Sequence, residues 1–125
     1  MKAISAVLLA AGRSSRMKQL KALLPWKGLP LIESQITEIL SSTVSELIVV
    51  LGYEADTLIP YTRPYPVKVV INKQFANGKT SSIIKGLQAV DPTSDAVFII
   101  SVDQPVTYET LERMIRHLNH AHKKI

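Results

Sequence analysis

Small residues and cations follow the first apolar run of this sequence. The segment Leu9-Ala10-Ala11-Gly12-Arg13-Ser14-Ser15-Arg16 leads on to Lys21. Small side chains let backbone N–H groups approach a ligand closely, and successive N–H groups form a concave anion site. Arg16 and Lys21 could then neutralise a triphosphate, one as a planar fork and the other as a point charge. The segment matches neither a Walker loop nor a Gly-x-Gly-x-x-Gly fingerprint, so an ordinary turn with solvated cations stays an alternative.

A lone carboxylate, Asp103, follows a later apolar run and precedes Pro105. Mg²⁺ takes hard oxygen ligands such as a carboxylate, and phosphate oxygens and waters usually complete its shell. The alternative for an isolated Asp after a strand is a turn or cap role. Next to a cationic phosphate loop, Asp103 becomes a candidate ligand for Mg²⁺.

A third polar segment, Asn77-Gly78-Lys79-Thr80-Ser81-Ser82, precedes a helical pattern. Its hydroxyls, its glycine and the free N–H groups of a helix start can bind a ribose, a base edge or an anion. The alternative is a loop with an ordinary N-cap. Farther along, His117, His120 and His122 have no acidic residue among them. They indicate a solvated helix end rather than a metal site.

The net charge of +5 over 125 residues is concentrated in one segment. Residues 1–32 hold six Lys or Arg and no acid, whereas the remainder holds nine cations and ten acids. Such a cluster favours a compact polyanion, such as a triphosphate, over a nucleic acid, which usually meets basic residues spread over a face. We expect no membrane span and no secretory signal. The absence of cysteine excludes disulfide and thiolate chemistry and fits a cytoplasmic protein.

The elements that must position these residues alternate along the chain. Short apolar runs predict buried strands at 3–10, 46–51, 67–72 and 96–102. Helical patterns occupy 31–40, 80 or 81 to 90, and the chain from about 107, with a short helix within 54–61. This order predicts an α/β fold of the three-layer α/β/α, Rossmann-like type, with a parallel sheet in one domain spanning 1–125.

The predicted topology brings the candidate residues together. Ligands of parallel sheets bind at the carboxyl ends of the strands, near the point where strand order reverses. The 10–16 loop, the 72–82 segment and Asp103 all fall at such ends. Pro25 and Trp26 are expected to pack the first loop against the body of the domain.

Taken together, these motifs resemble the molybdenum cofactor cytidylyltransferase family, which has the nucleotide-diphospho-sugar transferase-like fold. The resemblance covers nearly the whole chain. It rests on Leu9-Ala10-Ala11-Gly12-x-Ser14-x-Arg16-Met17 with Lys21-Ala22-Leu23-Leu24-Pro25, on Asn72 with Gly78-x-x-Ser81-Ser82, and on Val102-Asp103-Gln104-Pro105. The alanine pair before Gly12 resembles the cytidylyl-transferring branch, because the guanylyl-transferring branch tends to carry glycine at the second of these positions.

The resemblance implies a role for each motif. The implied nucleotide-binding residues are Leu9, Ala10, Ala11, Gly12, Arg13, Ser14, Ser15, Arg16, Lys21, Gly78, Ser81 and Ser82. The implied catalytic residues are Arg16 and Lys21, which would hold the triphosphate, and Asp103, which would hold Mg²⁺. The implied reaction transfers CMP from CTP to the terminal phosphate of molybdenum-carrying molybdopterin and releases pyrophosphate. A molybdoenzyme such as xanthine dehydrogenase is an implied partner.

The sequence departs from the family pattern at three places. Lys18 stands where the family usually has glycine, and Lys79 stands where it usually has an apolar or small residue. The family's domain also continues beyond the strand that carries Asp103, so we expect the C-terminal part to be missing here. A nucleotidyltransferase that uses GTP or a sugar phosphate, and a nucleotide-binding module without catalysis, therefore stay alternatives.

The missing part also predicts an open sheet edge. In the resembled fold, the strand before Asp103 lies beside the first strand, and the absent segment covers its other edge. An uncovered edge is a template for pairing with another chain. We therefore expect a homo-oligomer, or a partner, at this edge.

Overall fold

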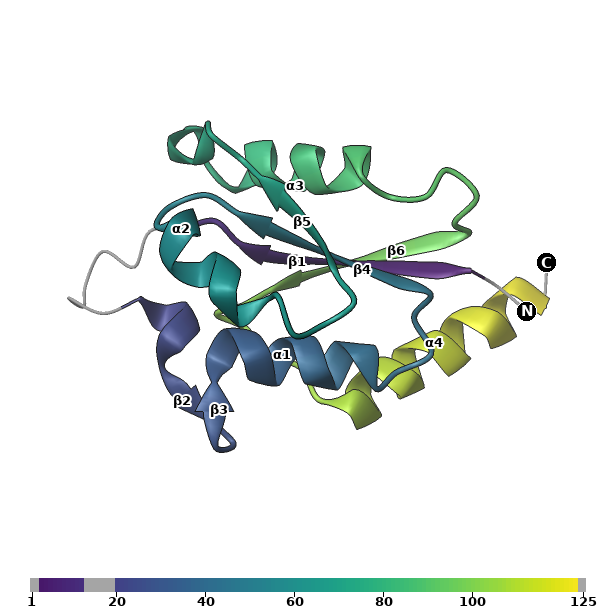
Figure 1. Ribbon diagram of the computed structural model, residues 1–125. Helices are drawn as coiled ribbons and strands as arrows, with labels where there is room; N and C mark the ends of the chain where they lie inside the picture. Colours follow the sequence, from purple (N-terminus) through teal and green to yellow (C-terminus); the bar gives the residue numbers. More distant parts are fainter. Residues whose placement is uncertain (1–2, 13–19, 124–125) are drawn as a thin grey trace.

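The computed structural model describes residues 3–12 and 20–123, and at its centre lies a parallel sheet (Figure 1). Its strands run in the spatial order β5-β4-β1-β6. Their bounds are Ile4–Ala10 for β1, Glu46–Leu51 for β4, Lys68–Ile71 for β5 and Ala96–Ser101 for β6. Each strand lies within one of the four predicted ranges, so the alternating pattern predicted the sheet correctly.

Strand β1 is the middle of the core. Its seven residues are all buried, and it pairs in parallel with β4 on one side and β6 on the other. Leu8, for example, lies opposite Val49 and Ile100. Because β1 is covered on both faces, its sequence is an almost unbroken apolar run without the alternation of a half-exposed strand.

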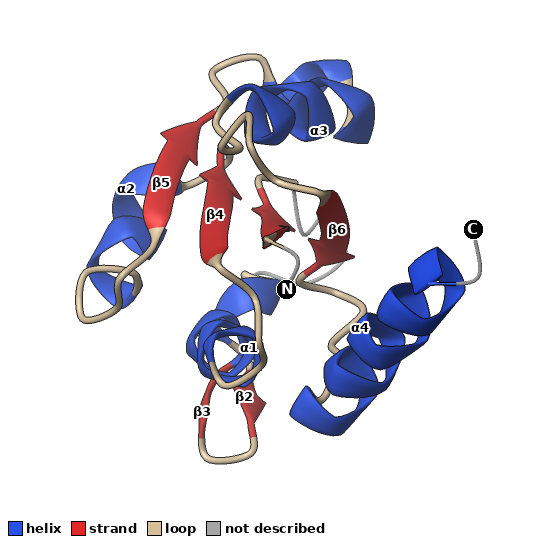
Figure 2. Cartoon of the chain, turned by 90° about the vertical axis from the view of Figure 1, so that its right-hand side faces the viewer, coloured by secondary structure: helices blue, strands red, loops and turns tan. Residues whose placement is uncertain are grey.

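Helices cover both faces of the sheet, which confirms the three-layer prediction. Helix α1 (Leu31–Leu40) and helix α4 (Tyr108–Lys123) lie on one face, and α3 (Lys79–Gln88) lies on the other (Figure 2). The first face packs the apolar side of α1, including Ile32 and Ile36, against Leu8 and its neighbours. The second face packs Ile83 of α3 into a smaller apolar cluster.

Gly86 lets α3 approach the sheet closely. A Cβ at this position would lie 2.5 Å from Val7 Cγ1 and 3.1 Å from Val50 Cγ2. Both valines are fully buried and β-branched, so neither can move aside easily. The glycine is therefore a packing requirement of the α3–sheet interface.

The Gly86→Ala variant should lower the free energy of unfolding by up to about 2 kcal/mol. Overpacking of a core costs about 1–3 kcal/mol, and the better helix propensity of alanine offsets about 1 kcal/mol of this. Denaturant unfolding measures the change, with Thr80→Ala at an exposed position of the same helix as the control. A Gly86→Ala chain more stable than the wild type would contradict the close packing.

A hairpin interrupts the segment before α1, and the sequence reasoning missed it. Strands β2 (Pro25–Trp26) and β3 (Leu29–Pro30) pair antiparallel around a two-residue turn. Lys27 and Gly28 both have positive φ, at 55° and 84°, as a tight hairpin turn requires. Pro25 and Trp26 are both exposed, Trp26 to 41%, and the loop that they are expected to pack lies mostly outside the described residues. The turn directs these residues along a ribbon that projects from the body.

The remaining elements are short. Helix α2 (Ala55–Leu58) continues into the 3₁₀ helix η2 (Ile59–Tyr61), where a single short helix was predicted. Two further 3₁₀ helices, η1 (Lys21–Leu23) and η3 (Phe75–Asn77), stand near the carboxyl end of the sheet. Helix α3 begins at Lys79, one or two residues earlier than predicted, because Gly78 with φ 101° occupies its N-cap.

The order of the strands reverses at β1. The chain passes from β1 to β4 on one side, and β6 returns to the other side of β1. The loops that follow β1 and β6 therefore flank the switch point where such sheets bind ligands. Among the described strands, β6 lies at one edge of the sheet, as predicted. Among the described helices, none is long and apolar enough to cross a membrane.

Candidate functional site

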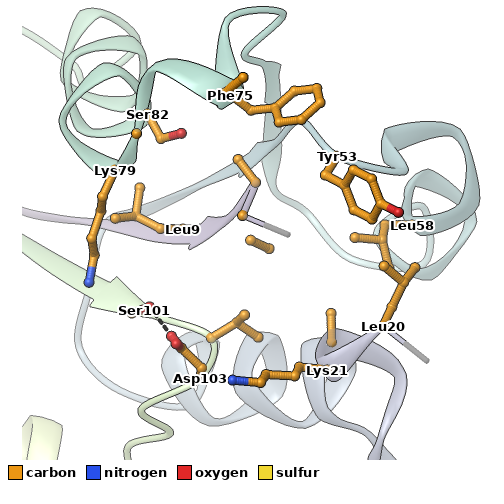
Figure 3. A pocket seen from close by; sticks show the side chains of 17 residues that line it. Leu9, Leu20, Lys21, Tyr53, Leu58, Phe75, Lys79, Ser82, Ser101 and Asp103 are labelled. Atoms are coloured by element: carbon orange, nitrogen blue, oxygen red, sulfur yellow. Dashed lines mark hydrogen bonds between the residues drawn. The ribbon is translucent and has the colours of Figure 1, made fainter. Parts of the chain in front are cut away.

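A cavity of about 470 Å³ opens at the carboxyl ends of β1 and β6 (Figure 3). The sequence-predicted residues that line it are Leu9, Ala10, Ala11, Gly12, Lys21, Gly78, Ser82 and Asp103. These residues come from four separate segments, so the topology brings them together as the strand-end rule predicted. Arg13, Ser14, Ser15 and Arg16 lie outside the described residues.

Backbone hydrogen bonds hold the strand ends around the cavity. The N–H of Tyr53, just beyond β4, donates to Ala11 O at 3.0 Å, and the N–H of Val102 donates to Leu9 O at 3.0 Å. A Cβ on Gly52 would lie 2.7 Å from Phe75 Cβ and 3.0 Å from Ala11 Cβ. Small residues at 11 and 52 are thus what lets these segments meet at the floor of the site.

Asp103 is anchored by its own strand end. The Ser101 hydroxyl donates a hydrogen bond to Asp103 Oδ1. Farther on, the buried Gln35 amide binds the backbone of Val106, accepting from its N–H at 3.0 Å and donating to its carbonyl at 3.2 Å. These contacts fix the turn after β6 between the sheet and α1.

The surroundings of Asp103 keep its carboxylate ionised. The Ser101 hydrogen bond is the main cause that lowers the pKa of Asp103, and the charges of Lys79 and Lys21 lower it further. Partial burial opposes this shift but does not reverse it. An ionised, hydrogen-bonded carboxylate at the cavity mouth is suited to a cation ligand.

The donor set fits Mg²⁺ as an ion held largely by its substrate. The described residues contain no cluster of three or more His, Cys, Asp or Glu side chains. Mg²⁺ commonly binds through one or two carboxylates plus phosphate oxygens and waters. Asp103 therefore fits as a protein carboxylate for a Mg²⁺–nucleotide complex.

A buried amide organises the second predicted nucleotide loop. Asn72, fully buried at the end of β5, donates through Nδ2 to Ser81 Oγ and Ser82 Oγ, each at 2.9 Å. Its Oδ1 accepts from the N–H of Gln74 at 3.0 Å. The Ser81 hydroxyl also binds the carbonyl of Gly78 at 2.7 Å. Ser82 lines the cavity, but Ser81 does not, so Ser81 holds the loop in shape.

The sequence reasoning missed the apolar wall of the cavity. Tyr53 and Phe75 line it, with ring centroids 5.8 Å apart and ring planes at 67°. Leu20 and Leu58 also contribute to this wall, and Ser101 adds a polar group to the lining. The available signal was position: Tyr53 follows β4 and Phe75 follows β5, at the same sheet edge as the predicted residues. An aromatic wall beside a polar mouth suits a ligand with one flat end and one charged end.

Comparison with known proteins identifies the family. The model of the MobA-like NTP transferase domain matches residues 6–125, nearly the whole chain. The chain belongs to this family. The resemblance found in the motifs around Gly12, Ser81 and Asp103 is therefore confirmed at the level of the family.

Curated relatives of this MobA-like domain carry different names. Nicotine blue oxidoreductase of Paenarthrobacter nicotinovorans is 32% identical over 114 residues, which are 90% of this chain and 55% of the relative. Molybdenum cofactor cytidylyltransferase of Escherichia coli is 31% identical over 106 residues, 84% of this chain and 54% of the relative. A probable molybdenum cofactor guanylyltransferase of Bacillus mycoides is 30% identical over 99 residues, which are 79% of this chain and 48% of the relative. The chain spans about half the length of these relatives.

Solved structures agree with the fold. A nucleotidyl transferase from Methanothermobacter superposes with a TM-score of 0.84 at 34% identity, covering 92% of this chain and 57% of that chain. The Mycobacterium tuberculosis protein Rv0371c, in a complex with manganese, superposes with a TM-score of 0.76 at 26% identity. The superposition covers 93% of this chain and 59% of that chain. The predicted α/β fold of the nucleotide-diphospho-sugar transferase type is therefore confirmed.

Proposed function

We propose that the chain binds CTP with Mg²⁺ and transfers CMP to the terminal phosphate of a molybdopterin-type acceptor. The observation that carries this proposal is the approach of Lys21 to the ionised Asp103 at the mouth of a cavity floored by 9–12. A cation for phosphate and a carboxylate for a metal are the two groups that a Mg²⁺–triphosphate needs. Residues 1–125 would then act as one nucleotide-binding domain.

The chemistry requires positioning and charge neutralisation without a covalent intermediate. A phosphate oxygen of the acceptor attacks the α-phosphorus of CTP. The bond from that phosphorus to the oxygen bridging the α- and β-phosphates breaks, and pyrophosphate leaves with the electron pair. Lys21, together with Arg16 as the sequence motif implies, would neutralise the triphosphate. Mg²⁺, held by Asp103, would offset the charge that develops on the phosphate oxygens.

The base and ribose have a suitable place in the same cavity. Leu9 and the alanines after it present small surfaces and backbone groups, and Tyr53 and Phe75 form the apolar side. The alanine at position 11 supports CTP as the preferred nucleotide. The names of the relatives include both cytidylyl- and guanylyltransferases, so GTP is the main competitor.

A second candidate function is nucleotide binding without transfer. The match covers 54% of the cytidylyltransferase relative, so the chain corresponds to part of that protein. In that case neither transfer to the acceptor nor contact with a molybdoenzyme such as xanthine dehydrogenase is expected of this chain.

One assay separates the two functions. The chain is supplied with CTP, Mg²⁺ and molybdopterin, and pyrophosphate release is followed with a coupled enzyme. Transfer predicts release that depends on both CTP and the acceptor, with a lower rate for GTP. Nucleotide binding that is saturable but gives no pyrophosphate would support the binding module and reject transfer by this chain.

We also propose that the outer edge of β6 pairs with the same edge of a second copy. The strand sequence Ala96–Ser101 contains no charged residue and no proline, the usual protections of an exposed edge. Ile99 is 40% exposed on this strand. Pairing across a two-fold axis would place like apolar residues together without charge repulsion.

Sedimentation tests this pairing. The wild-type chain should sediment as a dimer at tens of micromolar concentration, and Ile99→Lys should sediment as a monomer, because two-fold pairing would bring two lysines close together. Circular dichroism checks that the variant is folded. A wild-type chain that stays monomeric at every concentration would contradict the proposal.

A further inference from the structure

Lys79 reaches into the cavity from the side opposite to Lys21. It is the first residue of α3, and its side chain lines the cavity together with Ser82 of the same helix. Figure 3 shows its amine directed toward the strand end that carries Ser101 and Asp103, while the Lys21 amine approaches Asp103 from η1. The two lysines thus flank the carboxylate.

The Lys79 amine is poised for a ligand. Two lysines elsewhere on the protein form ion pairs: Lys68 Nζ lies 2.8 Å from Glu46 Oε1, and Lys27 Nζ lies 3.5 Å from Glu38 Oε1. Within the described part of the chain, the amine of Lys79 makes no such ion pair or hydrogen bond. Its charge is one of the causes that lower the pKa of Asp103.

The position of Lys79 also has an electrostatic cost for the fold. A cation in the first turn of a helix opposes the helix dipole, and no acid in the first turn of α3 compensates for it. Local rules of this kind are commonly broken at functional sites. A bound anion would offset this unfavourable interaction, because both the lysine and the positive end of the helix dipole attract negative charge.

We propose that Lys79 binds the triphosphate of the nucleotide, on the side opposite to Lys21. This inference rests on the proposed function, because it assigns a new phosphate contact within the same site. When Asp103 is engaged by a metal, two lysines face the polyanion across a gap between η1 and α3. Since phosphates are common to all nucleoside triphosphates, Lys79 adds affinity without selecting the base.

Calorimetric titration of a charge series tests the assignment. CTP, CDP and CMP are titrated with Mg²⁺ into the wild type, Lys79→Gln and Lys79→Arg. Lys79→Gln should bind CTP about fivefold more weakly, the size of a good ion pair at an exposed position. The loss should be smaller for CDP and absent for CMP. Lys79→Arg should retain most of the CTP affinity. In Lys79→Gln, the affinity for GTP should fall by the same factor as the affinity for CTP.

Two controls separate a ligand contact from a structural effect. Lys85→Gln changes a lysine of the same helix that does not line the cavity, and it should leave CTP affinity unchanged. Lys79→Gln should unfold at the same or a higher temperature than the wild type, because a cation is removed from a helix start.

The outcomes are distinguishable from those of the proposed function. Unchanged CTP affinity in Lys79→Gln, or an equal loss for CTP and CMP, would overturn the role of Lys79 while nucleotide binding stands. A wild-type chain that binds none of the nucleotides would overturn the proposed function itself, and the Lys79 contact with it.

Discussion

Replacing Asp103 by asparagine should reduce the rate of pyrophosphate release by about 10²–10³-fold, the usual cost of removing one preorganised group that stabilises transition-state charge. Asparagine keeps the size of the side chain and can still accept the Ser101 hydrogen bond. It lacks the negative charge that a Mg²⁺–nucleotide complex requires. The loss should therefore appear in the Mg²⁺ dependence of the reaction and leave the fold intact.

The measurement compares initial rates over a range of Mg²⁺ concentrations for the wild type and Asp103→Asn. Asp56→Asn is the matched control, because Asp56 is exposed on α2 and does not line the cavity. It should behave like the wild type. An Asp103→Asn chain that retains wild-type rates and the same Mg²⁺ dependence would remove this carboxylate from the proposed site.

Replacing Lys21 by glutamine should weaken CTP binding by about ten- to a hundredfold. A charge-assisted hydrogen bond contributes about 1.5–3 kcal/mol, which corresponds to a loss of this size. Lys21 lies in η1 beside the cavity, and its charge helps to lower the pKa of Asp103. The same substitution should have little effect on CMP, because the triphosphate provides the charge that Lys21 recognises.

Calorimetry with CTP and CMP checks this expectation, with Lys73→Gln as the control. Lys73 is exposed and follows β5 near the same sheet edge, but it does not line the cavity. If both lysine variants lost the same modest factor, a general effect of surface charge would explain the binding better than a specific contact.

The sheet could be predicted from the sequence because its strands carry their own signal. The continuous apolar runs of β1 and β4 are required by burial on both faces, and they appear directly in the residues. Asp103 and Lys21 could then be placed by the rule that ligands bind at the carboxyl ends of parallel strands. No detail of side-chain packing was needed for this step.

Features that depend on tertiary contacts could not be predicted in the same way. The Tyr53–Phe75 pair joins the ends of two different strands, and neither aromatic residue forms a pattern alone. The β2–β3 ribbon depends on Lys27 adopting positive φ, which is uncommon for a residue other than glycine. The orientation of Lys79 toward Asp103 depends on where α3 begins, and the sequence placed that start one or two residues too late.

The central claim is that the cavity between η1, α3 and the end of β6 holds a nucleoside triphosphate. Calorimetric titration of the wild-type chain with CTP and with GTP, each with and without Mg²⁺, tests it most directly. The account predicts saturable binding of one CTP per chain, strengthened by Mg²⁺ and tighter than binding of GTP. Absence of binding for both nucleotides in the presence of Mg²⁺ would contradict the phosphate site itself.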